Sequence, residues 1–370
     1  MIEISELFVL TIKFLATLAV AAFAGYLTSK IGVPVGWMIG AMFAVAVMNI
    51  LTDWTYFPYL FKYAIQVVTG AMIASRVGKN EISGMRRIVL PIAIVVLGMM
   101  LLNITFAYLI VMFSDLDIAT ALFAVTPGGI SDMAMISSEL GANYAIVAIL
   151  QVFRLFFLLS TMPPIFKSIA KKIKHNPEPV VINRTDDPLT DRSQLSTEDF
   201  KYGKKDIIRL AGLFLSAALG GLILHSLNIP AGFVIGSMSF GIVFSCIFGK
   251  SVYPKKIIPF QQILSGIFIG IGIDKEIVSS LEELIVPILV MMIGIVFFTF
   301  IIAFLLYKLT KLDLMTALLS STPGGITEMS ILSEEFGADT PKIAMIQTAR
   351  LIAVIALFPQ MIKFILALVK

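Results

Sequence analysis

The sequence predicts an all-α polytopic membrane protein made of two inverted repeats, each with five transmembrane helices and one re-entrant hairpin. Three observations support this fold class. The chain of 370 residues is 58% hydrophobic and only 14% charged, which is too apolar for a soluble domain of that size. Apolar stretches of about 20 residues, the length that crosses a bilayer, recur along it. A Thr-Pro-Gly-Gly motif occurs twice, at 126–129 and 322–325.

The two motifs are 196 positions apart, and the same offset aligns 7–174 with 203–370. Prolines, glycines and polar residues recur at this offset, among them Pro34 with Pro230 and Gln66 with Gln262. The chain is therefore an internal duplication. We predict a first membrane repeat at 1–170, a polar linker at 171–206 and a second membrane repeat at 207–370.

Apolar length places the transmembrane helices of the first repeat at 7–28, 33–52, 57–75, 88–113 and 144–166. Those of the second repeat are expected at 207–227, 229–249, 257–273, 284–307 and 341–368. The Thr-Pro-Gly-Gly motif lies between the fourth and fifth helix of each repeat, within 116–141 and 312–337. Each arm of these segments has about 10–12 residues, which is short for a crossing and favours a re-entrant hairpin.

The distribution of basic residues supports re-entry. With five crossings per half the repeats are inverted, and 21 of the 28 basic residues fall on the cytoplasmic side, against five outside. A hairpin that crossed fully would separate Arg86 and Arg87 from the basic cluster at 167–174, against the positive-inside rule. We therefore expect an outside N-terminus, a cytoplasmic linker at 171–206 and hairpin tips that meet at mid-membrane. A prokaryotic inner membrane is the simplest location.

Two arginines, Arg154 and Arg350, lie about ten residues, or roughly 15 Å, from either end of their predicted spans. A charge at that depth costs at least ~2.5 kcal/mol. One interpretation is an anion clamp, because a guanidinium group binds carboxylate or phosphate through two parallel hydrogen bonds. The other is a structural ion pair with Asp132 or Glu328, and the two are compatible.

Gln151 and Gln347 lie three residues before the arginines, on the same helix face. They could bind substrate, or they could satisfy the broken backbone of the hairpin. Helix breakers are tolerated in hydrocarbon only where the backbone lines a cavity or packs against protein. The Pro-Gly-Gly step removes one backbone donor and frees the φ angle at two positions.

Asp132 and Glu328 follow the two breaks. If a half-helix starts there, each carboxylate either pairs with the positive helix end or forms a coupling site for a cation or proton. The free N–H groups at the same half-helix starts are natural anion donors. Hydroxyl groups nearby are expected to add ligands or helix caps. The predicted substrate contacts therefore include Thr126, Pro127, Gly128, Gly129, Ser131, Thr322, Pro323, Gly324, Gly325 and Thr327.

Composition argues against several other functions. The chain has one cysteine, Cys246, and two histidines, His175 and His225, so we expect no disulfide, thiolate cluster, histidine metal site or cofactor beyond a coupling Na⁺ or H⁺. No nucleophile–base pair is visible, so an enzyme is not expected. The basic residues lie in loops between spans and predict no binding of nucleic acid.

The doubled pattern Thr-Pro-Gly-Gly-x-[Ser/Thr]-[Asp/Glu]-Met, then Gly-Ala-[Asn/Asp] and Gln-x-x-Arg, resembles the AbrB family of membrane transporters, often labelled ammonia-monooxygenase-like. The resemblance covers essentially the whole chain outside 171–206. It implies a fold of the cation:proton antiporter and anion transporter group, whereas the histidine count conflicts with the monooxygenase label. The architecture also resembles sodium–citrate and sodium–glutamate symporters, which work as elevators, and that likeness implies a homodimer.

We therefore expect a secondary active transporter of a small organic anion, coupled to Na⁺ or H⁺ and working by elevator-type alternating access. Arg154 and Arg350 would hold the anion, while Asp132 and Glu328 would set the coupling. One alternative is a cation/proton exchanger in which the arginines are structural. A second is a membrane receptor or regulatory protein without transport, which uses the linker at 171–206 to dock a partner.

Overall fold

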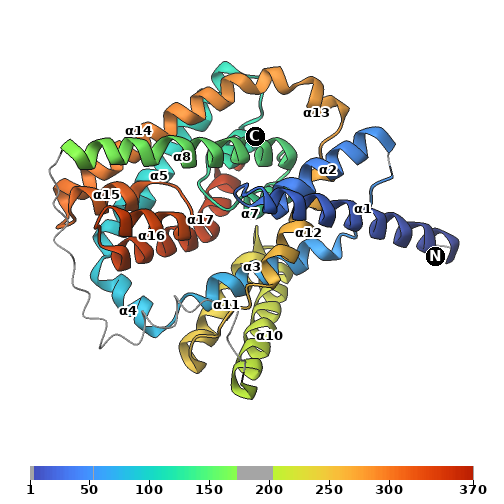
Figure 1. The fold of residues 1–370 in the computed structure, drawn as a ribbon, viewed down its shortest axis with the longest axis horizontal. Coiled ribbons are helices and arrows are strands. Elements are labelled where there is room, and N and C mark those ends of the chain that lie inside the picture. Colours follow the sequence, from blue (N-terminus) through green and yellow to red (C-terminus); the bar gives the residue numbers. More distant parts are fainter. Residues whose placement is uncertain (1–3, 53, 173–202, 370) are drawn as a thin grey trace.

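The computed structural model describes residues 4–52, 54–172 and 203–369, so most of the predicted linker at 171–206 lies outside the described part. The first half forms α1 (Ile4–Lys30), α2 (Gly36–Thr52), α3 (Leu60–Ser75), α4 (Lys79–Arg87), α5 (Val89–Phe113), α6 (Ile118–Val125), α7 (Ile130–Glu139) and α8 (Tyr144–Lys172) (Figure 1). The second half forms α10 (Lys204–Ser226), α11 (Gly232–Phe248), α12 (Ile257–Ile271), α13 (Lys275–Ser279), the 3₁₀ helix η1 (Leu281–Leu284), α14 (Ile285–Leu309), α15 (Leu314–Ser321), α16 (Ile326–Glu335) and α17 (Thr340–Val369). Within the described ranges there is no strand.

In the described part of the chain, six helices are long and apolar enough to cross a membrane: α1, α5, α8, α10, α14 and α17. The all-α membrane class predicted from composition is therefore confirmed. Four further apolar helices, α2, α3, α11 and α12, have only 15 to 17 residues. At helical rise 17 residues extend about 25 Å, somewhat less than a hydrocarbon core of about 30 Å. The ten predicted spans thus divide into six of full length and four short ones.

The duplication is visible in the helix boundaries. At the 196-residue offset α2 matches α11, α5 matches α14, α6 matches α15 and α7 matches α16, residue for residue at both ends. The main difference is that the first half has the polar helix α4 before α5, where the second has α13 and η1. The apolar-length rule did not predict these short polar helices, because they contain no apolar run.

The same local signals bound the two broken helices. The side chains of Asp117 and Asp313 cap α6 and α15 by accepting the N–H groups of residues 120 and 316. Gly141 and Gly337 follow α7 and α16 with φ angles of +76° and +63°. Glycine adopts this left-handed conformation without steric cost, so it ends each helix and turns the chain toward the next one.

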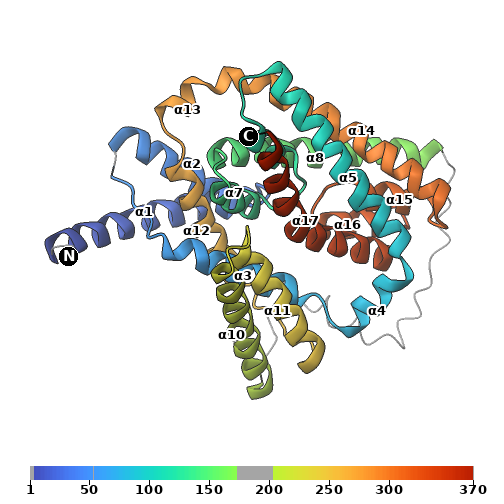
Figure 2. The ribbon, with the colours of Figure 1, turned by 180° about the vertical axis from the view of Figure 1, so that it is seen from behind.

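The helices form two bundles (Figures 1 and 2). In one bundle α1 packs on α2, α10 on α11, α2 on α12 and α3 on α11. We call this the short-helix bundle. In the other, α5 packs on α14, and the broken helices pack on α8 and α17. We call this the hairpin bundle, which comprises α5 to α8 and α14 to α17. Each bundle therefore takes matching helices from both halves of the chain.

Glycines allow the close helix contacts in the short-helix bundle. A Cβ on Gly266 of α12 would lie 2.5 Å from the carbonyl oxygen of Met38 in α2, and one on Gly70 of α3 would lie 2.7 Å from the amide nitrogen of Met238 in α11. A Cβ on Gly40 of α2 would likewise lie 2.5 Å from the carbonyl oxygen of Ala24 in α1. Small residues therefore let the backbones of these helices approach closely.

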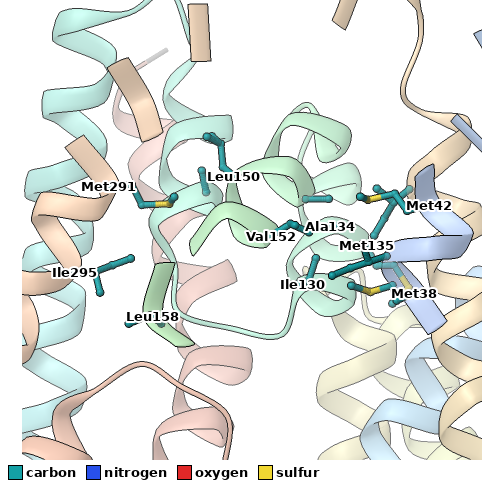
Figure 3. Packing of buried hydrophobic residues seen from close by; sticks show 14 of the residues in the cluster. Met38, Met42, Ile130, Ala134, Met135, Leu150, Val152, Leu158, Met291 and Ile295 are labelled. Carbon is teal, nitrogen blue, oxygen red and sulfur yellow. The ribbon is translucent and has the colours of Figure 1, made fainter. Parts of the chain in front are cut away.

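The two bundles meet across an apolar, methionine-lined interface. Figure 3 shows Met38 and Met42 of α2 facing Ile130 and Met135 of α7. On its other side α7 packs against α8 of its own bundle. Methionine is unbranched and adaptable, so this interface depends less on a fixed interlocking shape than one made of branched side chains would.

Candidate functional site

At the first helix break, Pro127 leaves a backbone carbonyl group without its usual hydrogen-bond donor. In a continuous helix the carbonyl oxygen of Phe123 would accept from the N–H of residue 127, but proline has none. The structure supplies a replacement donor from α8, since Gln151 Nε2 lies 3.0 Å from the Phe123 oxygen. The same amide nitrogen lies 3.2 Å from the oxygen of Ala124 and 2.8 Å from that of Thr126. The glutamine therefore satisfies the broken backbone, the structural one of the two roles predicted for it.

Arg154, one turn further along α8, binds the tip itself. Its Nη1 lies 2.7 Å from the carbonyl oxygen of Thr126, and its Nη2 lies 2.8 Å from that of Gly128. The side chain is 5% exposed. The Thr126 carbonyl lies at the C-terminal end of α6, where the helix dipole is negative and a cation is favourable, and Gly128 lies in the break that follows. The two terminal nitrogens predicted to hold an anion in a bidentate manner thus bind backbone in this conformation.

The second break has the same geometry. Gln347 Nε2 lies 2.9 Å from the oxygen of Leu319, whose usual partner would be the missing N–H of Pro323, and 3.0 Å from that of Thr322. Arg350 is also 5% exposed. Its Nη1 and Nη2 each lie 2.8 Å from a tip carbonyl, those of Thr322 and Gly324. In each half a glutamine and an arginine therefore bind the backbone carbonyl groups at the helix break.

The structure brings the two arginines into electrostatic range of each other. α15 contacts α8, α17 contacts α6, and the charge of Arg154 acts on Arg350. Ion pairs among the described side chains include Lys62–Glu139, Lys250–Glu81 and Lys342–Asp339. The sequence predicted a structural ion pair of the arginines with Asp132 or Glu328. Asp132 takes part in none of these three pairs, and the side chain of Glu328 lies outside the described part of the structure. The terminal nitrogens of Arg154 and Arg350 bind tip carbonyls instead.

Each guanidinium group keeps an unused donor. The Nε atoms of Arg154 and Arg350 are buried and have no partner among the described residues, and the same is true of Oε1 in Gln151 and Gln347. Such buried orphan atoms are uncommon, and they often mark a place for water or ligand. The matching atoms are orphaned in both halves.

The tip glycines serve close approach rather than unusual backbone angles. Gly129 and Gly325 have φ angles of −69° and −70°, so the freedom that the sequence suggested is not used. Instead, a Cβ on Gly128 would lie 2.6 Å from Cε of Met133, and one on Gly324 would lie 2.7 Å from Cε of Met329. The break is therefore packed tightly against its own half-helix.

Asp132 lies in the first turn of α7 and is 9% exposed. Its carboxylate turns back over the helix start, so that a Cβ on Gly129 would lie 2.5 Å from Oδ2. Across the bundle interface the hydroxyl group of Thr69 in α3 lies near this carboxylate. Thr69 Oγ1 in turn accepts from Nε2 of Gln261 in α12 at 2.5 Å. Within the described part of the chain no basic side chain pairs with Asp132.

The remaining predicted contacts line the same two breaks. Thr126 Oγ1 bonds back to the oxygen of Leu122 at 2.7 Å, as Thr322 does to Leu318. Ser131 donates to the sulfur of Met38 at 3.2 Å. The side chains of Thr327 and Glu328 lie outside the described part of the structure.

Sequence reasoning missed a second polar group at the bundle interface. Lys62 of α3 is fully buried and pairs with Glu139 at the end of α7, which also accepts from Gln66. Lys62 falls near one end of the predicted span at 57–75, where a lysine normally extends toward water. The available signal was Gln66, which follows one turn later on the same helix face. Among the described residues no group of three or more histidine, cysteine or acidic side chains could hold a metal ion.

Comparison with known proteins supports one family over nearly the whole chain. Residues 2–170 and 179–366 match the family model described as Transition state regulatory protein AbrB. The chain is 26% identical over 364 residues to the uncharacterized protein YhjN of Bacillus subtilis (strain 168), covering 94% of this chain and 92% of that protein. It is 23% identical over 336 residues to a protein of Escherichia coli (strain K12) named AbrB and described as a candidate regulator, with 90% of each chain covered. No solved structure matches. Because the family model spans both halves and both helix breaks, the chain belongs to the AbrB family.

Proposed function

We propose that this protein is a secondary transporter of a small organic anion, coupled to Na⁺ or H⁺ at Asp132. The observation that carries the proposal is a carboxylate that is nine-tenths buried at the interface of two bundles, with a hydroxyl neighbour and no basic partner among the described side chains. A buried carboxylate is costly unless it is neutralised. A proton or a bound cation would do this, and either can be exchanged during a transport cycle.

Long-range contacts support an inverted arrangement of the two repeats. Asn49, at the end of α2, donates to the oxygen of Ile271 at the end of α12. Glu81, after α3, pairs with Lys250, after α11. If the repeats were parallel, each of these pairs would lie on opposite faces of the membrane. With inversion each pair shares a face, and α6–α7 and α15–α16 become re-entrant hairpins that enter from opposite sides.

The anionic cargo is supported by the charge around the two tips. Two guanidinium groups lie within range of each other, each with an unused buried Nε–H. The starts of α7 and α16 add backbone N–H groups and positive helix ends. An anion would bind to these donors, because the terminal nitrogens of Arg154 and Arg350 are already engaged. The predicted contacts at 126–131 and 322–327 belong to this region.

Elevator motion is supported by the interface between the bundles. The hairpin bundle, which would carry cargo and coupling ion, meets the short-helix bundle through the methionine-lined surface of Figure 3. A surface of adaptable side chains tolerates sliding better than one of interlocked branched residues. In this proposal the short-helix bundle stays fixed, as part of a homodimer in the inner membrane.

The proposal is tested by measuring the midpoint of thermal unfolding of the detergent-purified protein as Na⁺ is titrated against K⁺ at two pH values. A cation at 100 times its dissociation constant stabilises by ~2.7 kcal/mol. Lower pH should weaken the Na⁺ response, because a protonated carboxyl group does not bind Na⁺. Asp132→Asn should remove the Na⁺ and pH responses, whereas Asp115→Asn, a change at an exposed carboxylate, should keep them. Equal responses in wild type and Asp132→Asn would contradict the proposal.

Two competing functions each have one supporting observation. The engagement of both arginines with backbone supports a cation/proton exchanger, and in that case Na⁺ uptake into proteoliposomes would need Asp132 but no anion. The description of the Escherichia coli relative as a candidate regulator supports a regulatory membrane protein. Deleting 177–198 should then abolish its output, whereas a transporter would retain most of its uptake.

A further inference from the structure

Three donor groups surround the carboxylate of Glu139 at one end of the bundle interface. The carboxylate of Glu139 belongs to α7 in the hairpin bundle. Its Oε1 accepts from Gln66 Nε2 at 2.8 Å and lies 3.4 Å from Lys62 Nζ, and its Oε2 accepts from the backbone N–H of Ala231 at 3.2 Å. Lys62 also donates to Tyr59 and Ser138, at 3.2 and 2.9 Å.

The groups that bind this carboxylate come from the other bundle. Lys62 and Gln66 lie on α3, and Ala231 caps the start of α11, whose positive end therefore faces the carboxylate. An ammonium group, an amide N–H and a helix start together form a receptor for a carboxylate. In this conformation a side chain of the same protein fills it.

Two features indicate that the receptor accepts more than Glu139. Lys62 is fully buried while Glu139 is 19% exposed, so the carboxylate occupies the accessible side of the site. Gln66 Oε1 is buried and has no partner in the described part of the chain, although its own Nε2 binds Glu139. That acceptor is available to a donor group, which a glutamate side chain does not provide.

The second half of the chain serves as an internal comparison. Glu335 matches Glu139 at the 196-residue offset and is exposed, and Ile258 stands where the first half has Lys62. A glutamate at this helix end therefore does not need a lysine partner. The receptor combines α3 of the first half with the start of α11 of the second half, and it is not a consequence of the duplication.

We propose that Lys62, Gln66 and the Ala231 N–H form a binding site for a carboxylate ligand. Glu139 occupies this site in the present conformation, so the ligand and Glu139 would bind there in turn. A ligand with a hydroxyl group beside the carboxylate would also engage Gln66 Oε1. Moving the hairpin bundle withdraws Glu139 and vacates the site. If the proposed transport function is correct, this ligand is the transported anion on its way to the tips. The binding of a carboxylate at this site does not depend on that function.

Thermal unfolding of the purified full chain tests the site, with acetate and glycolate as probes and chloride at equal ionic strength as reference. Glu139→Gln removes the competing charge at nearly constant volume, so its apparent dissociation constant for acetate should fall at least tenfold below that of wild type. Glycolate should bind more tightly than acetate. Glu139→Gln/Lys62→Met should lose the response, and Glu335→Gln should respond as wild type does.

No difference between acetate and chloride in Glu139→Gln would overturn the site. Equal binding of acetate and glycolate would overturn the role given to Gln66 Oε1. If Glu139→Ala folds only when acetate is present, the site is supported, because an external carboxylate then replaces the lost one. If acetate does not recover it, the site is overturned. Since binding is measured without transport, loss of the Asp132-dependent Na⁺ response would contradict the proposed function and leave this result intact.

Discussion

The two halves of the chain agree at the helix breaks and differ at the bundle interface. At the breaks Gln151 and Gln347 supply the donors that proline removes, and the arginine bonds to the tips have nearly the same lengths. At the interface the first half has Lys62 and the second has Ile258. Groups present in both halves satisfy the broken backbone, so they inform us about the fold. Groups present in one half are better candidates for specific binding.

The largest expected effect comes from removing either arginine. Arg154→Met or Arg350→Met removes two charge-assisted hydrogen bonds and leaves tip carbonyls short of donors. We expect each variant to lose about 3 kcal/mol or more of the free energy of unfolding. Arg→Lys should recover only part of this, because an ammonium group cannot form the same planar fork. Equilibrium unfolding in mixed detergent micelles measures the losses.

Arg209→Met is the control, since Arg209 is exposed and its substitution removes the same charge. Its effect should stay within about 0.5 kcal/mol. If Arg154→Met and Arg350→Met differed by more than about 1.5 kcal/mol, the two breaks would not be energetically equivalent. One of the two arginines would then have a further role in addition to binding the backbone carbonyl groups.

The glutamines provide a finer test of the same equivalence. Gln151 Nε2 reaches three carbonyl oxygens, whereas Gln347 Nε2 reaches two. Gln→Met keeps the length of the side chain and removes the donor. We expect a loss of about 1–3 kcal/mol at each site, with the larger loss at Gln151. Unfolding in the same micelles gives the ranking, and a larger loss at Gln347 would contradict it.

Much of this fold was predictable because its signals are local. Apolar runs and helix breakers located the ten apolar spans, six of full length and four short, and both broken helices within a few residues. The 196-residue offset predicted that the halves share one order of helices. The short helices α4 and α13 were missed, since a polar stretch of five to nine residues has no distinctive pattern.

The partners of the site residues were harder to predict because they depend on packing between distant segments. Depth in the membrane identified Arg154 as unusual, yet its partners are carbonyl groups 26 and 28 residues away, which no side-chain pattern reveals. Asp132 was identified, but Thr69 and Gln261 come from two other helices. Lys62 was not singled out, because the meeting of α3 with the end of α7 is a tertiary contact.

The smallest expected effect lies behind the tips, where Asn103 and Thr299 occupy matching positions on α5 and α14. Asn103 Nδ2 donates to the oxygen of Leu122 at 3.1 Å and to Thr126 Oγ1 at 3.0 Å. Thr299 Oγ1 is buried without a partner among the described residues. Asn103→Leu should therefore cost about 1–2 kcal/mol, while Thr299→Val should change stability by less than about 0.5 kcal/mol or increase it slightly. Both values come from unfolding curves in mixed micelles, with Thr105→Val on the exposed side of α5 as the control. Equal losses at the two positions would mean that Thr299 has a hydrogen-bond partner, most simply an ordered water. The side chain from α14 would then stabilise the second break as Asn103 of α5 stabilises the first.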